Sequence, residues 1–364
     1  VNIYQLTLPF TATPAAGNIA ATQQDGFGLI NQPGSYIWWQ SNLLDMSVWP
    51  ALNFASASGD PDNIVQAVQI HREIFLIKSG ETEVWVNAGT PNFAFARLDG
   101  IYIEAGIAAF ASLAQVGEDL MWLAQDGNGQ AVVVRLHVYD PVDVSDHAVV
   151  QVWQSYPTIS DAIAYAYQQG RHTFYVISFP SGNATWVYDV TESGLLGVPC
   201  WHQRGAFSNG QFGRTLSQTG LSGINSVTFS AGTIVGDYTN GNLYKVNPNG
   251  LTDNGEPRKW LRTWRATPQP TMQPQRFTSL QIDMMTGIGV PDGTAPQVVL
   301  RWSDDGGHLF SNEMFAAAGA LGATAQRVKF NRLGSTRRNS GLYRIFELSS
   351  SDAFPAALIG AVLE

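Results

Sequence analysis

The sequence predicts an all-β protein, in which a β-propeller of about five to six blades precedes a small C-terminal β-sandwich. Three observations carry this prediction. Large and small residues alternate with a period of two in the clearest segments. Asn-Gly and Asp-Gly pairs, which are strong short hairpin signals, separate the apolar runs. A four-strand pattern recurs along the N-terminal part of the chain, whereas the C-terminal part carries separate strand signals.

The clearest four-strand unit is DAIAYAYQQGRHTFYVISFPSGNATWVYD, which begins at Asp161. Its alanines suggest a helix at first sight. However, Ile163, Tyr165 and Tyr167 alternate strictly with alanines, which puts large side chains on one face of a strand and small ones on the other. Turns in QQGR and PSGN follow, and a last strand is expected after a Gly-rich loop. Four such antiparallel strands form a meander, the unit of a propeller blade.

The same pattern recurs in VQAVQIHREIFLIKSGETEVWVN, DLMWLAQDGNGQAVVVRLHVYD and AGTIVGDYTNGNLYKVN, and more weakly in SYIWWQSNLLDMSVW. Each small sheet has an apolar face that it cannot bury alone, so stacking the sheets radially is favoured. A sixth blade could be shared between the N-terminal strand and a later segment. The return strands of the five visible units are expected about 40 to 60 residues apart, near Met46, Trp85, Val133, Trp186 and Tyr244.

The predicted domain boundary is the segment RATPQPTMQPQR, residues 265–276, which carries three prolines and few apolar residues. We expect it to be a Pro-rich linker between a propeller at 1–264 and a sandwich at 277–364. Strand candidates in the second domain are FTSLQIDMM, QVVLRWS, RVKFNRL and YRIFELS. The Ala-rich stretch FAAAGALGATA contains two glycines, which favours a loop over a helix.

The segment RWSDDGGHLF fits the Asp-box pattern, in which Ser-x-Asp-x-Gly is followed by an aromatic residue. Asp boxes are associated with sialidases and related sugar-cleaving propellers. Here the box occurs once, outside the predicted propeller, and Asp side chains commonly bond backbone N–H groups in tight turns. We therefore expect a structural turn rather than a catalytic site. The residues of this turn are Ser303, Asp305, Gly307 and Phe310.

Charge is sparse and unevenly distributed. Charged residues make up 13% of the chain, and the net charge is −9. Residues 1–257 hold 21 acidic and 8 basic residues, a net charge of −13, whereas residues 258–364 hold 8 acidic and 12 basic residues, a net charge of +4. This split suggests two domains with different neighbours. No apolar run is long enough for a membrane span, no signal peptide is recognisable, and the single cysteine, Cys200, excludes an intrachain disulfide.

Motifs for catalysis are weak. The chain has no phosphate-binding loop and no G-x-S-x-G elbow, and its histidines are not spaced as metal ligands, so we expect no cofactor, no metal and no enzymatic activity. The alternative is a glycan-binding or glycan-cleaving, sialidase-like propeller that acts on host surface sugars. That alternative requires arginines to converge on a substrate carboxylate. The candidates are Arg72, Arg97, Arg135, Arg171, Arg204 and Arg214.

Basic residues form two clusters in the C-terminal part. The first is interleaved with tryptophans, which also suits a strip that contacts a nucleic-acid backbone. Because the acidic propeller would repel DNA, we favour contact with a partner protein over solvation or DNA binding. The candidate interface consists of Arg258, Lys259, Arg262 and Arg265 in the first cluster and Arg332, Arg337 and Arg338 in the second.

Long pieces of the chain resemble the packaged-DNA stabilisation proteins of short-tailed bacteriophages. The resemblance spans about residues 45–352, in order. It is carried by WPALNFASASGDPDNIVQAVQIHREIFLIKSGETEVWVNAG, DAIAYAYQQGRHTFYVISFP, TWVYDV, VVLRWSDDGGHLFSN and RLGSTRRNSGLYRIFELSSSD. It implies a propeller with added β domains, which agrees with the reading from the residues.

The resemblance also implies a function. Such proteins are non-enzymatic tail hub or nozzle components that form hexameric rings below the portal and its adaptor, close the DNA exit channel and carry spikes, fibres or a needle. We therefore expect a virion tail protein that is assembled in the host cytoplasm. DNA is expected to pass through the channel without sequence-specific binding. The acidic body would keep that DNA mobile at the channel wall.

Overall fold

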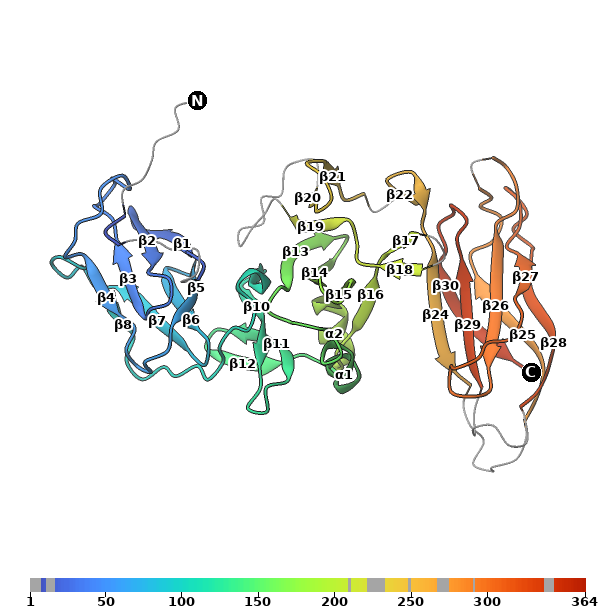
Figure 1. Ribbon diagram of the computed structural model, residues 1–364. Helices are drawn as coiled ribbons and strands as arrows, with labels where there is room; N and C mark the ends of the chain where they lie inside the picture. The colour runs from blue at the N-terminus through green and yellow to red at the C-terminus, as the bar shows by residue number, and fades with distance from the viewer. Residues whose placement is uncertain are drawn as a thin grey trace. The chain divides into compact units, whose positions relative to one another are not determined.

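The computed structural model describes residues 8–10, 17–208, 211–220, 233–247, 250–266, 275–290, 292–336 and 344–364. Within these residues nearly all regular structure is β-strand, with two short α-helices (Figure 1). The chain divides into two compact units, one made of Val1–Gly205 with Phe212–Val246 and the other of Ala206–Gln211 with Asn247–Glu364.

The first unit begins with two four-stranded antiparallel sheets whose strands follow chain order. The turn between β5 and β6 places His71 and Arg72 at φ values of 51° and 65°, the geometry of a tight two-residue hairpin. The strands of the first sheet are β1 (Ala21–Gln24), β2 (Phe27–Asn31), β3 (Ile37–Gln40) and β4 (Phe54–Ser56). Those of the second sheet are β5 (Ile64–Ile70), β6 (Glu73–Lys78), β7 (Thr82–Asn87) and β8 (Phe95–Arg97).

Two further four-stranded meanders follow, and a three-stranded sheet completes the series. The third sheet is β9 (Ala114–Val116), β10 (Asp119–Gln125), β11 (Ala131–His137) and β12 (Asp140–Asp143), preceded by a 3-10 turn at Phe110–Ser112. The fourth is β13 (Ile163–Gln169), β14 (His172–Phe179), β15 (Ala184–Asp189) and β16 (Trp201–Arg204), and the fifth is β19 (Ser217–Gly220), β20 (Ile234–Asp237) and β21 (Leu243–Lys245). These five sheets coincide with the five repeats expected from the sequence.

Each sheet shares an apolar core with the next one along the chain. In β6, Ile74 packs with Trp38 of the first sheet, whereas Phe75 packs with Trp122 of the third. The same division applies to β13, where the alanines join the core shared with the third sheet and Tyr165 joins the core shared with the fifth. The period of two seen in the sequence therefore marks strands that are buried on both faces.

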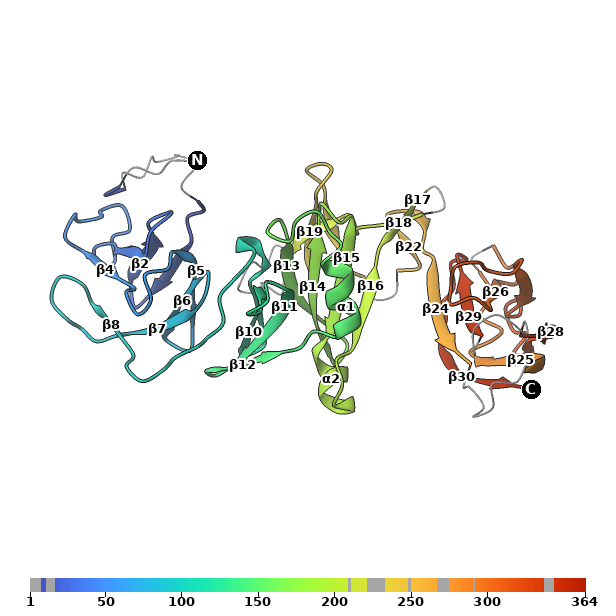
Figure 2. The same ribbon diagram turned by 60° about the horizontal axis from the view of Figure 1, so that its bottom comes forward.

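Two short helices were not predicted. α1 (His147–Trp153) and α2 (Val190–Leu196) lie against the β13–β16 sheet (Figure 2). Each begins at an aspartate whose side chain accepts a backbone N–H, from Ala148 to Asp146 in α1 and from Glu192 to Asp189 in α2. The expected Gly-rich loop after β15 is thus partly helical, because Asp189 provides an N-cap and Gly197 ends the helix at a φ of 68°.

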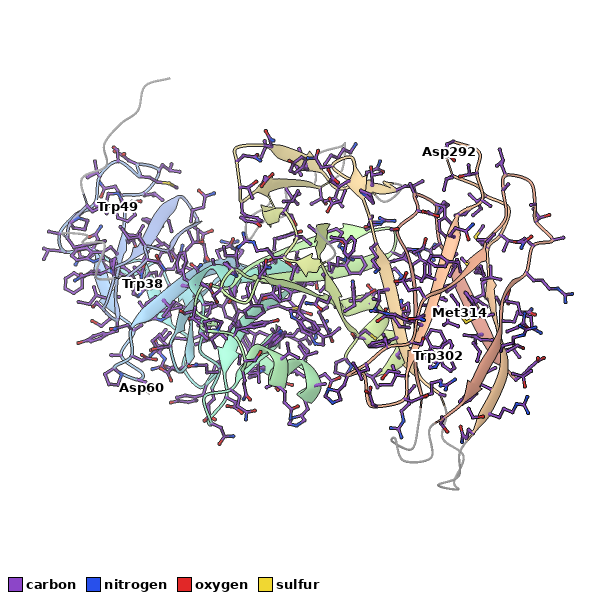
Figure 3. All side chains as sticks on the ribbon, turned by 45° about the vertical axis from the view of Figure 1, so that its right-hand side comes forward. Trp38, Trp49, Asp60, Asp292, Trp302 and Met314 are labelled. Carbon is purple, nitrogen blue, oxygen red and sulfur yellow. The ribbon has the colours of Figure 1, made fainter. Side chains whose placement is uncertain are left out.

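The first sheet also corrects the sequence interpretation. Met46 was expected in a return strand, but it lies in the long connection between β3 and β4, which we call the 41–53 loop. The return strand is β4, which begins after this loop. Trp49 in the loop and Asp60, which follows β4, lie at opposite ends of the first sheet (Figure 3).

The second unit is a β-sandwich of a four-stranded sheet, ordered β24-β29-β26-β27, and a three-stranded sheet, ordered β28-β25-β30. Their inner faces share one core that includes Leu280, Leu300 and Phe346, and Trp302 and Met314 pack against it (Figure 3). Its strands are β24 (Trp260–Arg265), β25 (Arg276–Met284), β26 (Gln297–Ser303), β27 (Met314–Ala317), β28 (Val328–Ser335), β29 (Ile345–Ser350) and β30 (Leu358–Leu363).

The segment just before the predicted linker belongs to the sandwich and not, as expected from the sequence, to the propeller. Residues 260–264 were assigned to the propeller, but β24 pairs along its whole length with β29 of the sandwich. Trp260 and Trp264 both pack against the sandwich core, which explains why this basic segment carries tryptophans. Most of the expected linker, residues 267–274, lies outside the described residues. Two minor sheets complete the chain, β17 (Ala206–Ser208) with β18 (Gln211–Gly213) and β22 (Thr252–Asp253) with β23 (Glu256–Pro257).

Candidate interaction surfaces

The Asp-box segment forms a closed turn at the end of β26. The Ser303 hydroxyl donates to Asp305 Oδ1 at 2.7 Å and accepts from the Gly307 backbone N–H at 2.9 Å. Asp305 Oδ1 also accepts the Leu309 N–H at 2.9 Å. Gly307 adopts a φ of 97°, a conformation that side-chain-bearing residues rarely reach. The geometry of the turn therefore explains why serine, aspartate and glycine occupy positions 303, 305 and 307.

Other residues of this segment contact side chains on or beside the neighbouring strands. Phe310 folds back so that the Arg301 guanidinium lies 4.5 Å from its ring centroid, and Arg301 also pairs with Glu347. Asp304 accepts from Nε and Nη2 of Arg344 at 2.7 and 2.8 Å. Asp304 and Asp305 are therefore both held by the protein's own donors, which is a structural arrangement rather than an acid and base pair.

The Asp305→Ala variant should destabilise the sandwich, because the turn loses the acceptor for Leu309 and Ser303. The hydrogen bond from Leu309, followed by that from Ser303, lowers the pKa of Asp305 below its usual 3.8. A lowered pKa means that Asp305 stabilises the fold above pH 3.8 and that this contribution is lost as the pH falls through the folded-state pKa. Thermal unfolding of wild type and variant between pH 3 and 7 should show two melting temperatures that converge at the acid end. A constant difference across that range would contradict the assignment.

The six arginines considered for a sugar carboxylate do not share a partner. Arg72 pairs with Asp25, Arg97 with Glu83 and Arg135 with Asp119, so each has a different carboxylate partner. Arg204 lies over the rings of Tyr167 and Phe174, and Arg214 over Tyr238. Arg171 is exposed, and the structure gives it no ion pair with a carboxylate. Among the described residues, the arrangement required by the sialidase-like alternative is not formed.

Other site types are sparsely represented. Across the described ranges, no three side chains of His, Cys, Asp or Glu gather as a metal site would require. The helices of the described residues are too short and too polar to cross a membrane. A pocket of about 180 Å³ lies between the second and third sheets, where the Tyr139 hydroxyl donates to Glu73 at 2.5 Å. That hydrogen bond raises the pKa of Tyr139 to about 12, so Tyr139 stays protonated and cannot act as a base near neutral pH.

The two basic clusters are carried by different sheets of the sandwich. Arg262 and Arg265 project from β24, an edge strand of the four-stranded sheet, and both are exposed. Arg258 is exposed just before β24, and Lys259 lies 5.0 Å from the Phe207 ring centroid. Arg332 lies on β28 of the other sheet, with a φ of 63°. Arg337 and Arg338 fall outside the described residues.

The sequence interpretation missed the 41–53 loop, which presents a large apolar surface. Its backbone is held by a hydrogen bond within the loop, from the Asn42 N–H to the Val48 carbonyl at 3.0 Å, and by one to the β1–β2 turn, from the Leu44 N–H to the Gly26 carbonyl at 2.8 Å. Leu44 has a φ of 59°, which is costly for a residue with a side chain, and its side chain lies over Gly26, where an added Cβ would be 2.8 Å from Leu44 Cδ2 unless that side chain shifted. The exposed apolar side chains of this surface are Leu43, Leu44, Met46, Val48 and Leu52 of the loop and Phe54, the first residue of β4.

A hydrogen-bonded loop that exposes several leucines, one of them with a strained backbone, is typical of a protein-binding surface. A second apolar protrusion is formed by α2 and the residues after it, with Leu195, Leu196 and Val198 exposed. By contrast, the turns between the second and third strands of the third and fifth sheets are polar. There Asp126 accepts the Gln130 backbone N–H and Asp237 accepts the Thr239 backbone N–H. The alternation of side chains in the strands does not distinguish apolar from polar connections. The apolar composition of SNLLDMSVWPALN, however, could have identified the exposed loop.

Comparison with known proteins supports the architecture directly. Residues 7–250 match the family model described as bacteriophage P22 Gp10, beta-propeller, and residues 264–361 match the one described as bacteriophage P22 Gp10, beta-sandwich. No curated protein sequence matches the chain.

Solved structures give weaker likenesses. YjhT is 10% identical with a TM-score of 0.34, over 58% of this chain and 70% of that chain. The extracellular domain of the hybrid two-component system BT4673 from B. thetaiotaomicron is 9% identical with a TM-score of 0.22, over 87% of this chain and 53% of that one. Both likenesses are too weak to assign a fold or a function.

The two family matches follow each other along the chain and agree with the five stacked sheets and the sandwich seen in the structure. Together they cover well over half of the sequence, which confirms the expected fold class and the expected family. The chain therefore belongs to the family of bacteriophage P22 Gp10 and is a structural component of a phage tail.

Proposed function

We propose that this chain assembles into a homo-oligomeric ring, a hexamer, below the portal and adaptor proteins of the virion, where it closes the DNA exit channel and retains the packaged genome. The ring also docks the tail spikes, fibres or needle. The protein acts by assembly and not by catalysis, and it is assembled in the host cytoplasm. Family membership supports a tail component, and the ordered apolar 41–53 loop supports assembly through protein contacts.

The charge distribution supports different roles for residues 1–257 and residues 258–364. Residues 1–257 have a net charge of −13, which would let DNA slide along a channel wall without adhering. Arg258, Arg262 and Arg265 are exposed and Lys259 is half-buried, and this basic segment suits an acidic partner protein. We place the partner contact at Arg258, Lys259, Arg262 and Arg265, with Arg332, Arg337 and Arg338 as its second part.

The Leu44→Asp/Leu52→Asp variant tests the assembly role of the 41–53 loop. These side chains are 83% and 79% exposed, so the folded chain should lose little stability. Loss of two interface anchors should weaken association at least about tenfold. Sedimentation of the full chain with its portal and adaptor partners, and the copy number of the chain in purified virions, measure this directly. Leu321→Asp, at a leucine that is 77% exposed in the sandwich, is the matched control.

Two results would contradict these proposals. Unchanged association of the Leu44→Asp/Leu52→Asp variant would overturn the role of the 41–53 loop in assembly. Turnover of a fluorogenic glycoside by the pure chain, lost when Arg72 or Arg135 is replaced by methionine, would favour the glycan-cleaving alternative.

A further inference from the structure

Three cationic side chains are buried in the described part of the chain, and two of them have carboxylate partners. Lys78 Nζ lies 2.9 Å from Glu83, and Arg344 binds Asp304 through two nitrogens. Arg214 is 9% exposed, and the structure gives it no ion pair. All Asp and Glu residues of the chain lie within the described ranges, so the missing partner is not hidden in an undescribed segment.

Arg214 is held in a defined position. Its backbone N–H donates to Asn183 Oδ1 at 3.1 Å, and the next N–H, from Thr215, donates to Thr185 Oγ1 at 3.1 Å. The guanidinium carbon lies 3.4 Å from the centroid of the Tyr238 ring. Nε is fully buried and has no hydrogen-bond acceptor. A stacked guanidinium keeps its N–H donors in its own plane, where they can engage a planar oxyanion.

An unpaired buried cation is costly, and the chain avoids this cost at Lys78 and Arg344. The unpaired charge of Arg214 therefore indicates that this side chain gains a carboxylate partner only when another molecule binds. We propose that Arg214 and Tyr238 form a socket for a carboxylate side chain of a neighbouring copy of this chain. The inference deepens the proposed ring function, because it names one contact between adjacent copies and the chemistry of that contact.

Several observations favour a protein carboxylate over a DNA phosphate. DNA backbones are bound by several cations in a row, whereas this socket contains one guanidinium within a segment whose net charge is −13. Arg and Tyr are enriched in protein interface cores, and Tyr238 is 40% exposed beside the socket. The chain has 29 acidic and 20 basic residues, so each copy offers surplus carboxylates. Adjacent copies in a ring meet through two different surfaces, which permits an arginine on one and a carboxylate on the other.

The first test uses the isolated full-length chain and does not depend on ring formation. Arg214→Met should raise the melting temperature by about 2–4 °C, because it removes an uncompensated buried charge while keeping contact with Tyr238. Sodium acetate should raise the melting temperature of the wild type relative to chloride at equal ionic strength, and should leave Arg214→Met unchanged. Arg171→Met, at an exposed arginine, is the matched control and should resemble the wild type. A melting temperature of Arg214→Met that is equal to or below the wild type would overturn the socket.

The second test measures assembly. Arg214→Met should weaken association of the full chain at least about tenfold in sedimentation, whereas Arg171→Met should not. Wild-type association by Arg214→Met would overturn the assignment to a contact between copies, and so would selective loss of duplex DNA binding in a gel shift. If the wild-type chain does not associate at all, even with its portal and adaptor partners, the ring proposal fails, while the acetate response still decides whether the socket exists.

Discussion

The Asp304→Ala variant is expected to lower the free energy of unfolding of the sandwich by about 3–5 kcal/mol, because it leaves a buried cation without its counter-charge. Arg344 has a side chain that is 1% exposed and depends on Asp304 for its carboxylate contact. Its other donors reach the carbonyl oxygens of Leu333 at 2.6 Å and Ser335 at 3.2 Å. These carbonyls orient the guanidinium, but they cannot neutralise it.

The aromatic surroundings of Arg344 add to this effect. Its guanidinium carbon lies 5.0 Å from the ring centroid of Trp302 and 5.1 Å from that of Phe277, which come from the two different sheets. The cation therefore joins the Asp-box turn, the end of β28 and the start of β29 at the edge of the core. Any shift of Arg344 toward water would disturb all three segments together.

Hydrogen exchange of the full chain in increasing denaturant measures this effect on the sandwich separately from the propeller. Peptides that cover β26 and β29 should lose protection at lower denaturant in Asp304→Ala than in the wild type. Asp283→Ala is the matched control, because Asp283 is exposed on β25 and should change stability by about 0.5 kcal/mol or less. Equal protection in Asp304→Ala and Asp283→Ala would contradict the proposed role of the ion pair.

The sequence was sufficient for strands whose pattern is local. The alternation of Tyr165 and Tyr167 with alanines predicted β13, because the tyrosines are buried in one core and the alanines in another, on opposite faces of the strand. The hairpin at Asp126 was predictable for a similar reason, since Asp126 accepts the backbone N–H groups of Asn128 and Gln130 within the same turn. In these segments the local preference and the tertiary contacts specify the same conformation.

The remaining features depend on contacts that a single segment does not encode. The run HAVVQVW is rich in β-branched residues, yet it forms α1 because Val149 and Trp153 are buried against the fourth sheet. The tryptophans of β24 were interpreted as part of a binding strip, whereas they face the sandwich core. Arg344 could not be identified because its partner Asp304 lies 40 residues away in the sequence. The Arg214 socket could not be identified from the sequence either, because it is defined by the lack of an ion pair at Arg214 in the folded chain.

The Glu83→Ala variant should destabilise the propeller unit by about 3–5 kcal/mol. Lys78 has a fully buried side chain and lies 2.9 Å from Glu83, whose own side chain is 1% exposed. Glu83 also accepts from the Gly59 N–H at 2.9 Å and from the Trp85 indole N–H at 3.1 Å. Removing this carboxylate leaves several buried donors unsatisfied in addition to a cation that retains only Glu81 as its acidic partner.

A double-mutant cycle separates the lost ion pair from the lost packing. Lys78→Met/Glu83→Gln should be less destabilised than the sum of its two single variants, because the double variant removes both members of the fully buried pair and leaves only the partly exposed Glu81 and Arg97 without them. The coupling should be about 1–3 kcal/mol, measured by hydrogen exchange of peptides that cover β6 and β7. Glu118→Ala, at an exposed glutamate of the third sheet, is the matched control. Additive single variants would show that Lys78 and Glu83 act independently and that the hydrogen bonds to Gly59 and Trp85 account for the effect.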